Sequence, residues 1–296
     1  MDEKKYAHMH LDKGFIAAMD QSGGSSPQSL KNYGIPESAY HSEKEMFDLM
    51  HSMRTRIITS PCFSGEHILG AILFEGTMER KIEGQYTGDY LWEKKGICSF
   101  LNIDKNMLDE KDHVRLMKNI PHLEDTLRHA YEDRHIFGTK ERSVINDYDP
   151  NGIAAIVDQQ FELAKKVNDA GLVPIVEPEV GIHTPNREKS EKCLHDLIKK
   201  YLEQANESFR MILKISIPVN ENLYLDLMND PHICRIAALS GGYSREEAVS
   251  LLTKNKGLIA SFSRALTQGL NVNQTDEEFA NTLSNSINEI YNASIR

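Results

Sequence analysis

The sequence predicts an α/β fold, a closed (β/α)8 barrel formed by a single domain. Short apolar runs alternate with amphipathic helical patterns along the 296 residues. Each run is almost continuously apolar, which is typical of parallel strands that are covered on both faces. About eight such units in about 300 residues favour a closed TIM barrel over an open doubly wound sheet.

Seven apolar runs predict strands, and a weaker run predicts an eighth. The turn after the first run contains two glycines but no GxGxxG pattern, so a dinucleotide-binding fold has little support. The seven runs cover residues 14–20, 68–74, 97–104, 171–177, 211–218, 236–240 and 258–262, and the weaker one covers residues 135–140.

Helical patterns fill the connections between these runs. One helix opens with Ser244 and Glu247, which form a capping-box pattern. The whole chain, residues 1–296, is predicted to be one catalytic domain with a short N-terminal extension, about residues 1–13, and a C-terminal helix, about residues 275–291.

The composition restricts the classes of binding partner and the cellular compartment that we expect. There are 34 Lys and Arg residues against 44 Asp and Glu residues, a net charge of −10, which argues against a nucleic-acid partner. No apolar run approaches 18 residues and no signal-peptide pattern is visible, so we expect a cytoplasmic protein without a membrane partner. Four scattered cysteines without CxxC spacing indicate neither a disulfide framework nor a zinc site. Monomer, dimer and tetramer all remain open.

Lys214 is the most informative residue because it lies in the middle of the strand-like run 211–218. Its long side chain can reach water while its stem stays buried. Alternatively, it stands in a dry pocket, where burial and nearby cations lower the pKa of the amine so that it attacks a carbonyl and forms a Schiff base. The residues at the other strand ends decide between these two interpretations.

Catalytic side chains of such barrels gather at the C-terminal ends of the strands. Each polar residue found there is individually compatible with a surface turn. Together, two lysines and a carboxylate supply a nucleophilic amine, a cationic neighbour and a proton carrier. The polar residues at the predicted ends are Asp20, Asp104, Lys140, Glu177, Lys214, Ser240 and Arg264.

Two neighbouring loops predict a phosphate site. Ser240 and Gly241 precede a helix N-terminus, where free backbone amides attract anions. Ser263 and Arg264 follow the next strand, and phosphate sites of many barrels lie between the last two loops. Arg264 can donate paired hydrogen bonds to a phosphate.

Six segments together resemble the signatures of class I (Schiff-base) fructose-1,6-bisphosphate aldolases, and the short chain is most similar to the bacterial branch. The resemblance spans roughly residues 14–291. The segments are DQSGGS at 20–25, FGTKER at 137–142, VPIVEPE at 173–179, LK at 213–214, LSGG at 239–242 and SRAL at 263–266.

The resemblance implies a glycolytic and gluconeogenic enzyme that cleaves a sugar bisphosphate into triose phosphates without a metal or other cofactor. Lys214 would form the imine with the C2 ketone, Glu177 would shuttle protons, Lys140 would depress the pKa of Lys214, and Asp20 would orient or deprotonate the C4 hydroxyl. The implied phosphate ligands are Ser240, Gly241, Ser263 and Arg264 at the 1-phosphate, and Ser22, Ser25 and Arg142 toward the 6-phosphate.

Two positions depart from the family pattern. Asn102 stands where the family usually has a lysine near the 6-phosphate, and Lys105 is the nearby cation that would compensate for it. Animal members end in a mobile tyrosine tail, whereas Tyr291 lies on the apolar stripe of the last helix and is predicted to pack.

Other functions compete with this interpretation. His8 and His10 have the HxH spacing of metal-dependent hydrolase barrels. A transaldolase, a deoxyribose-phosphate aldolase or a tagatose-bisphosphate aldolase would share Lys214. A barrel that has lost activity, or one with an additional binding role, is the non-enzymatic alternative.

Overall fold

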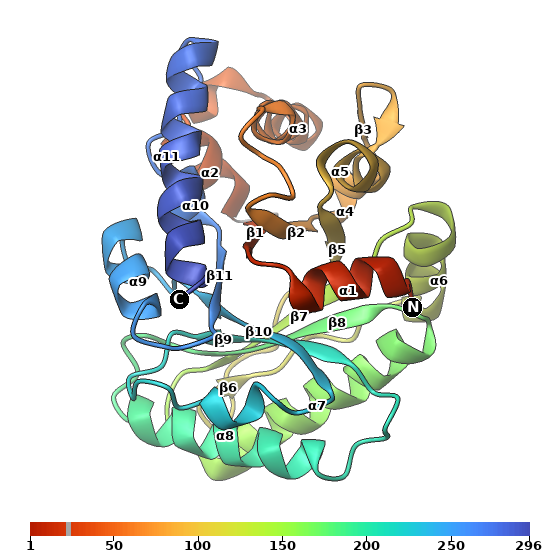
Figure 1. Ribbon diagram of the computed structural model, residues 1–296, viewed down its shortest axis with the longest axis vertical. Helices are drawn as coiled ribbons and strands as arrows, with labels where there is room; N and C mark the ends of the chain where they lie inside the picture. The colour runs from red at the N-terminus through yellow and green to blue at the C-terminus, as the bar shows by residue number, and fades with distance from the viewer. Residues whose placement is uncertain (22–24) are drawn as a thin grey trace.

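Eight parallel strands close into a barrel in the computed structural model, which describes residues 1–21 and 25–296 (Figure 1). Neighbouring strands pair in chain order, and β5 and β7 pair directly, which closes the barrel. This confirms the predicted (β/α)8 fold. The barrel strands are β1 (Phe15–Met19), β2 (Ile68–Leu73), β5 (Cys98–Asn102), β7 (Gly138–Ile145), β8 (Val173–Val180), β9 (Met211–Ser216), β10 (Ile233–Leu239) and β11 (Ile259–Phe262).

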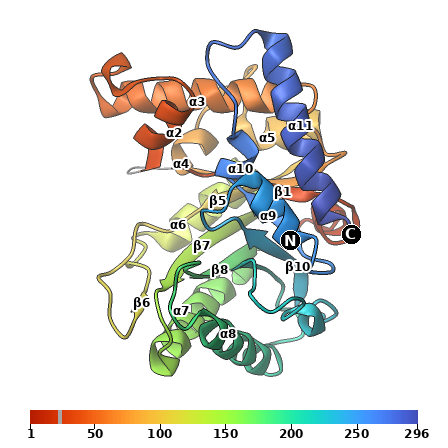
Figure 2. The ribbon, with the colours of Figure 1, turned by 90° about the vertical axis from the view of Figure 1, so that its left-hand side faces the viewer.

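Helices surround the barrel, with α3 and α11 on one side and α7 and α8 on the opposite side (Figures 1 and 2). The connection from β9 to β10 departs from the regular alternation because its only helical element is a short 3₁₀ turn, Leu225–Leu227. Within the described ranges, no helix has the length and apolar character needed to span a membrane. The α-helices are α1 (Glu3–Leu11), α2 (Ser26–Asn32), α3 (Glu43–Thr59), α4 (Glu75–Met78), α5 (Thr87–Lys95), α6 (Leu123–Arg128), α7 (Pro150–Asp169), α8 (Arg187–Leu202), α9 (Arg245–Leu252), α10 (Arg264–Thr267) and α11 (Asp276–Ser294).

Three short strands lie outside the regular pattern. β3 (Lys81–Ile82) and β4 (Gln85–Tyr86) form a small antiparallel pair. β6 (Val114–Arg115) pairs antiparallel with the last residues of β7. It belongs to a long loop that projects on the same side of the barrel as α2 (Figure 2).

The eighth strand was predicted too early, at residues 135–140. β7 begins only at Gly138 and continues to Ile145, beyond the apolar run. The sequence did not show this because the middle of the strand, residues 140–143, is polar and gives no hydrophobic signal. Gly138 is required where it is, since a Cβ there would lie 2.0 Å from the Val173 carbonyl oxygen and 2.7 Å from the Phe100 ring. Lys140 is therefore a mid-strand residue and not the last residue of its strand.

The first 13 residues, which we expected to be a short extension, contain the helix α1. Asp2 caps this helix by accepting hydrogen bonds from the backbone N–H groups of Lys4 and Lys5. Met9 is fully buried and packs with side chains of the barrel interior, among them Ile16 and Phe100. Helix α1 thus closes the N-terminal end of the barrel.

The capping box of α9 and the presence of the last helix match their predictions. Ser244 with Glu247 caps α9, and Thr275 with Glu278 caps α11. Tyr291 on α11 packs against the apolar core and meets the ring of His67 edge to face, with 4.4 Å between the ring centroids. Tyr291 packs, as predicted from its place on the helix stripe.

A buried carboxyl group lies on the outer face of β7. Side chains alternate along a strand, so Glu141 points away from the face that carries Lys140 and Arg142. Glu141 is fully buried, and its Oε2 accepts a hydrogen bond of 3.0 Å from Thr139. Burial raises the pKa of Glu141 to about 8.

Replacing Glu141 with Gln is expected to stabilise the protein at pH 8 and to have no such effect near pH 4. An unfolded glutamate ionises near its ordinary pKa of about 4.3, whereas folded Glu141 keeps its proton until about pH 8. The unfolded state therefore binds fewer protons in this window, and wild-type stability falls as pH rises by up to about 1.4 kcal/mol per pH unit. Chemical unfolding of both proteins from pH 4 to pH 9 measures the difference, and parallel pH profiles would contradict it.

Candidate functional site

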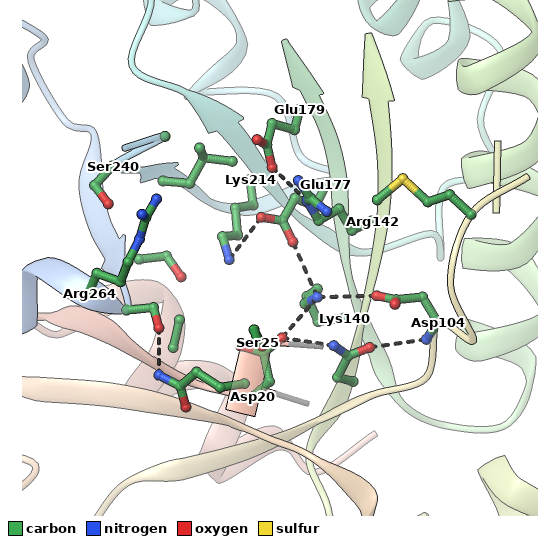
Figure 3. A pocket seen from close by; sticks show the side chains of 18 of the residues that line it. Asp20, Ser25, Asp104, Lys140, Arg142, Glu177, Glu179, Lys214, Ser240 and Arg264 are labelled. Carbon is green, nitrogen blue, oxygen red and sulfur yellow. Dashed lines mark hydrogen bonds and ion pairs between the residues drawn. The ribbon is translucent and has the colours of Figure 1, made fainter. Parts of the chain in front are cut away.

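A pocket of about 850 Å³ opens at the C-terminal ends of the barrel strands. Three buried charged side chains line it: Lys140, Glu177 and Lys214 are 3%, 3% and 4% exposed. Lys214 Nζ lies 3.0 Å from Glu177 Oε1, and Lys140 Nζ lies 3.5 Å from Glu177 Oε2 (Figure 3). One carboxylate therefore stands between two ammonium groups.

Strand register brings these groups together. β8 lies between β7 and β9, with Arg142 opposite Glu177 and Val176 opposite Leu213. The next residue of β9 is Lys214, which places its amine beside Glu177. Residues two apart on a strand face the same side, so Lys140 and Arg142 both point into the pocket.

Lys140 is the centre of a cluster of carboxylates. Its Nζ lies 2.9 Å from Asp20 Oδ2 and 3.2 Å from Asp104 Oδ2, in addition to its contact with Glu177. Burial alone would lower the pKa of Lys140, but the three carboxylates outweigh burial and raise it above its usual range. Burial alone would likewise raise the pKa of Asp20, but Lys140 and Lys214 hold it well below its usual range. Lys140 is therefore an ammonium group and Asp20 a carboxylate at neutral pH.

Asn102, the residue that departs from the family pattern, contacts this cluster directly. It lies opposite Lys140 in the register between β5 and β7. Its amide nitrogen donates a hydrogen bond of 2.8 Å to Asp20 Oδ2, and its amide oxygen accepts one of 3.1 Å from the backbone N–H of Asp104. A neutral amide thus binds the same Asp20 oxygen that the Lys140 ammonium group contacts.

The two loops predicted to bind phosphate meet on one side of Lys214. Ser240 and Arg264 lie together in Figure 3, away from Asp104. Gly241 has a positive φ of 61°, and a Cβ there would approach the Ile182 side chain to 2.6 Å. A Cβ on Gly242 would lie 3.6 Å from the Arg264 guanidinium, so the backbone of this turn passes close to that cation.

Ser263 and Arg264 follow strand β11, as the apolar run 258–262 predicts. Strand β11 stops at Phe262, and Arg264 is the first residue of the short helix α10. Ser263 Oγ accepts a hydrogen bond of 2.7 Å from the Gln21 side-chain amide. The loop after β1 is thereby tied to the loop after β11.

Two of the other predicted phosphate ligands, Arg142 and Ser25, also line the pocket. Arg142 Nε donates to Glu179 Oε2 at 2.6 Å. Burial would lower the pKa of Arg142, but Glu179 outweighs burial and raises it. Ser25 lines the pocket just before α2, and Ser22 lies outside the described residues.

Lys105 does not supply to the pocket the positive charge that is missing at Asn102, which corrects our expectation. Its ammonium group lies 2.7 Å from Glu75 Oε2 in a partly exposed ion pair, and neither residue lines the pocket.

Arg54 is a residue of the site that the sequence did not reveal. It comes from α3, is 2% exposed, and donates to Thr77 Oγ1 at 2.6 Å and to the Gln21 carbonyl oxygen at 2.5 Å. Burial lowers the pKa of Arg54 to about 10, although Asp20 opposes this shift. A single arginine within an amphipathic helix gives no signal of its own, and only the fold shows that it supports the loop that follows Asp20.

The HxH pair lies at the wrong end of the barrel for a hydrolase metal site. His8 and His10 are on α1, with His8 Nδ1 2.7 Å from Asp12 Oδ2 and His10 Nδ1 2.9 Å from the carbonyl oxygen of Cys234 near the start of β10. In residues 1–21 and 25–296, no group of three or more His, Cys, Asp or Glu side chains is arranged to hold a metal ion. The four cysteines are free, as predicted from their spacing.

Comparisons with known proteins agree with this geometry. The chain is 54% identical over 295 residues to the protein named fructose-bisphosphate aldolase class 1 of Clostridium acetobutylicum, with full coverage of both chains. Its structure resembles that of a fructose-bisphosphate aldolase from Plasmodium falciparum with a TM-score of 0.75, covering 98% of this chain and 92% of the other at 19% identity. At this sequence identity, the structural similarity shows a shared fold only. No protein-family profile matches the chain.

Replacing Arg54 with Lys is expected to lower the free energy of unfolding by about 1–3 kcal/mol, because one ammonium group cannot replace the planar fork that donates to both Thr77 and Gln21. The Michaelis constant for the substrate should rise, since Gln21 also holds Ser263. Denaturant unfolding and steady-state kinetics measure the two effects. Arg128→Lys on the exposed surface of α6 is the matched control, with an expected change within about 0.5 kcal/mol. Equal stability of the two variants would contradict this role for Arg54.

Proposed function

The chain belongs to the class 1 fructose-bisphosphate aldolase family, and on this premise we propose that it reversibly cleaves fructose 1,6-bisphosphate into dihydroxyacetone phosphate and glyceraldehyde 3-phosphate through an imine on Lys214. The observation that carries the proposal is the buried Lys214–Glu177 pair, 3.0 Å apart, at the C-terminal ends of the strands. It places a nucleophilic amine beside a group that can carry its protons.

Imine formation begins when Glu177 accepts a proton from Lys214 and the free amine attacks the C2 ketone. The resulting carbinolamine loses water after Glu177 returns a proton to its hydroxyl group. Glu177 Oε2 has no hydrogen-bond partner among the described residues and faces Lys140, so one carboxylate oxygen is available for this exchange. The ammonium group of Lys140 is the fixed positive charge beside it, and its influence on Lys214 stays a prediction.

Cleavage follows when Asp20 accepts the proton of the C4 hydroxyl. The electrons of the C3–C4 bond move into the protonated imine, which becomes an enamine, and the C4 aldehyde leaves as glyceraldehyde 3-phosphate. Protonation at C3 and hydrolysis of the imine release dihydroxyacetone phosphate and regenerate Lys214. Asp20 suits this step because Lys140 keeps it ionised and Asn102 fixes its orientation.

The phosphate groups are proposed to bind on either side of this cluster. Arg264 with Ser240, Gly241 and Ser263 would hold the 1-phosphate, while Arg142, Ser25 and Ser22 would face the 6-phosphate end. The protonated imine supplies the electrophilic pull, so the proposed chemistry uses no metal or other cofactor. We further propose that the enzyme works in the cytoplasm on these sugar and triose phosphates.

Borohydride reduction in the presence of dihydroxyacetone phosphate is expected to add a covalent adduct to the wild-type protein, as measured by intact mass, and EDTA should not prevent it. Lys214→Met should abolish the adduct. Lys105→Met, which removes an amine outside the pocket, should retain it. An adduct that persists in Lys214→Met, or cleavage activity that is lost to EDTA, would overturn the imine on Lys214.

Replacing Glu177 with Gln should lower kcat by about 10²- to 10⁴-fold, because the variant keeps the shape of the site but cannot carry a proton. The rate of imine formation, followed by rapid quench with borohydride, should fall by a similar factor. If the imine forms at the wild-type rate in Glu177→Gln, the proton shuttle belongs to another group.

A further inference from the structure

The second phosphate is predicted to bind on the Asp104 side of the pocket. The residues predicted to bind it include no cation that is free of an ion pair. Arg142 is paired with Glu179, and Asn102 is neutral. Lys140 is surrounded by three carboxylates, and Lys105 is paired with Glu75 outside the pocket. A phosphate dianion at this end needs positive charge from elsewhere.

Arg115 and Lys118 line this same pocket and are not assigned any role so far. Within the described ranges, neither side chain makes an ion pair, and Arg115 makes one hydrogen bond, from Nε to the carbonyl oxygen of Leu108 at 3.0 Å. Both cations thus line the pocket without a carboxylate partner. Asp109 also lines the pocket, and it forms no ion pair with either cation.

The backbone fixes both cations on the side of the second phosphate. Arg115 lies in β6 opposite Val144, at the C-terminal end of the strand that carries Lys140. Lys118 is held by a backbone hydrogen bond of 3.0 Å from its N–H to the carbonyl oxygen of Asn106, two residues after Asp104. Asp104 lies on the opposite side of Lys214 from Arg264 and Ser240 (Figure 3).

The loop that carries these cations is built to hold its position. Gln159 of α7 both donates to the carbonyl oxygen of Met117 and accepts from its backbone N–H, at 2.9 and 2.8 Å. Met117, between the two cations in sequence, is 3% exposed and packs in the apolar layer under the loop. On the facing side of the pocket, α2 contributes only uncharged lining residues in the described part of the chain, namely Gln28, Ser29 and Asn32.

We propose that Arg115 and Lys118 bind the 6-phosphate of the sugar bisphosphate and determine the preference for a bisphosphate over a monophosphate. The inference rests on the proposed function. Arg115 offers planar paired donors to phosphate oxygens, and Lys118 adds a point charge. The chain has a net charge of −10 and therefore repels an anionic substrate overall. Two cations without ion-pair partners on one wall of the pocket provide the local positive charge that attracts such a substrate.

The test compares fructose 1,6-bisphosphate with fructose 1-phosphate, which lacks the group that the two cations are proposed to bind. Arg115→Gln and Lys118→Gln are each expected to lower kcat/KM for the bisphosphate by about tenfold or more, and the double variant by about 100-fold or more. For fructose 1-phosphate, each variant should stay within about twofold of the wild type. Lys111→Gln, in the same loop but outside the pocket, is the matched control and should change neither value.

The outcomes separate this inference from the function on which it rests. Equal losses on both substrates would assign Arg115 and Lys118 to the shape of the loop and overturn the phosphate contact, as would unchanged activity on the bisphosphate. Arg115→Lys, which keeps the charge, should retain part of the preference if the contact exists. If the wild type cleaves neither sugar and traps no imine, the proposed function itself fails, irrespective of the variants.

Discussion

The ammonium group of Lys140 is the interaction on which the rest of the site depends. It is almost completely buried and touches carboxylates that lie just after β1, just after β5 and within β8. A charge in such a place is costly unless opposite charges surround it, and removal of the cation would leave three carboxylates repelling one another. The ion pair that offsets the cost of burying Lys140 is therefore the same ion pair that keeps Asp20 ionised.

The barrel makes this arrangement possible by its register. Asn102 lies opposite Lys140, and Arg142 lies opposite Glu177, so adjacent strands present complementary groups at one level of the pocket. The helix α1 closes the other end with Met9, which keeps that side of the barrel interior apolar. Charged groups are thus concentrated at one end of an otherwise hydrophobic barrel, where they are shielded from bulk water and act strongly on each other.

The sequence predicted the fold and the central residues because both leave local signals. Apolar runs mark seven strands, and a lysine inside such a run stands out. The eighth strand was misplaced because the middle of β7, residues 140–143, is polar: Arg142 lines the pocket and Glu141 is a buried carboxyl group, so neither looks like a strand residue. Arg54 and Arg115 were not found because their relation to the site arises from tertiary packing and from the β6–β7 pairing, which no local pattern encodes.

The charged residues of the pocket form two sets. The central residues are held in ion pairs with one another, whereas the cations at the two ends have no ion-pair partner among the described residues. In the centre, Lys140, Lys214 and Arg142 are in ion pairs with Asp20, Asp104, Glu177 and Glu179, so three positive charges meet four negative ones. A centre with more carboxylates than cations does not attract an anion. Attraction of a bisphosphate must come from cations outside the pairs: Arg264 on one side and, in our proposal, Arg115 and Lys118 on the other. In the proposed mechanism, binding at the two ends brings the ketone over Lys214 and leaves the contact between Lys140 and Asp20 in place.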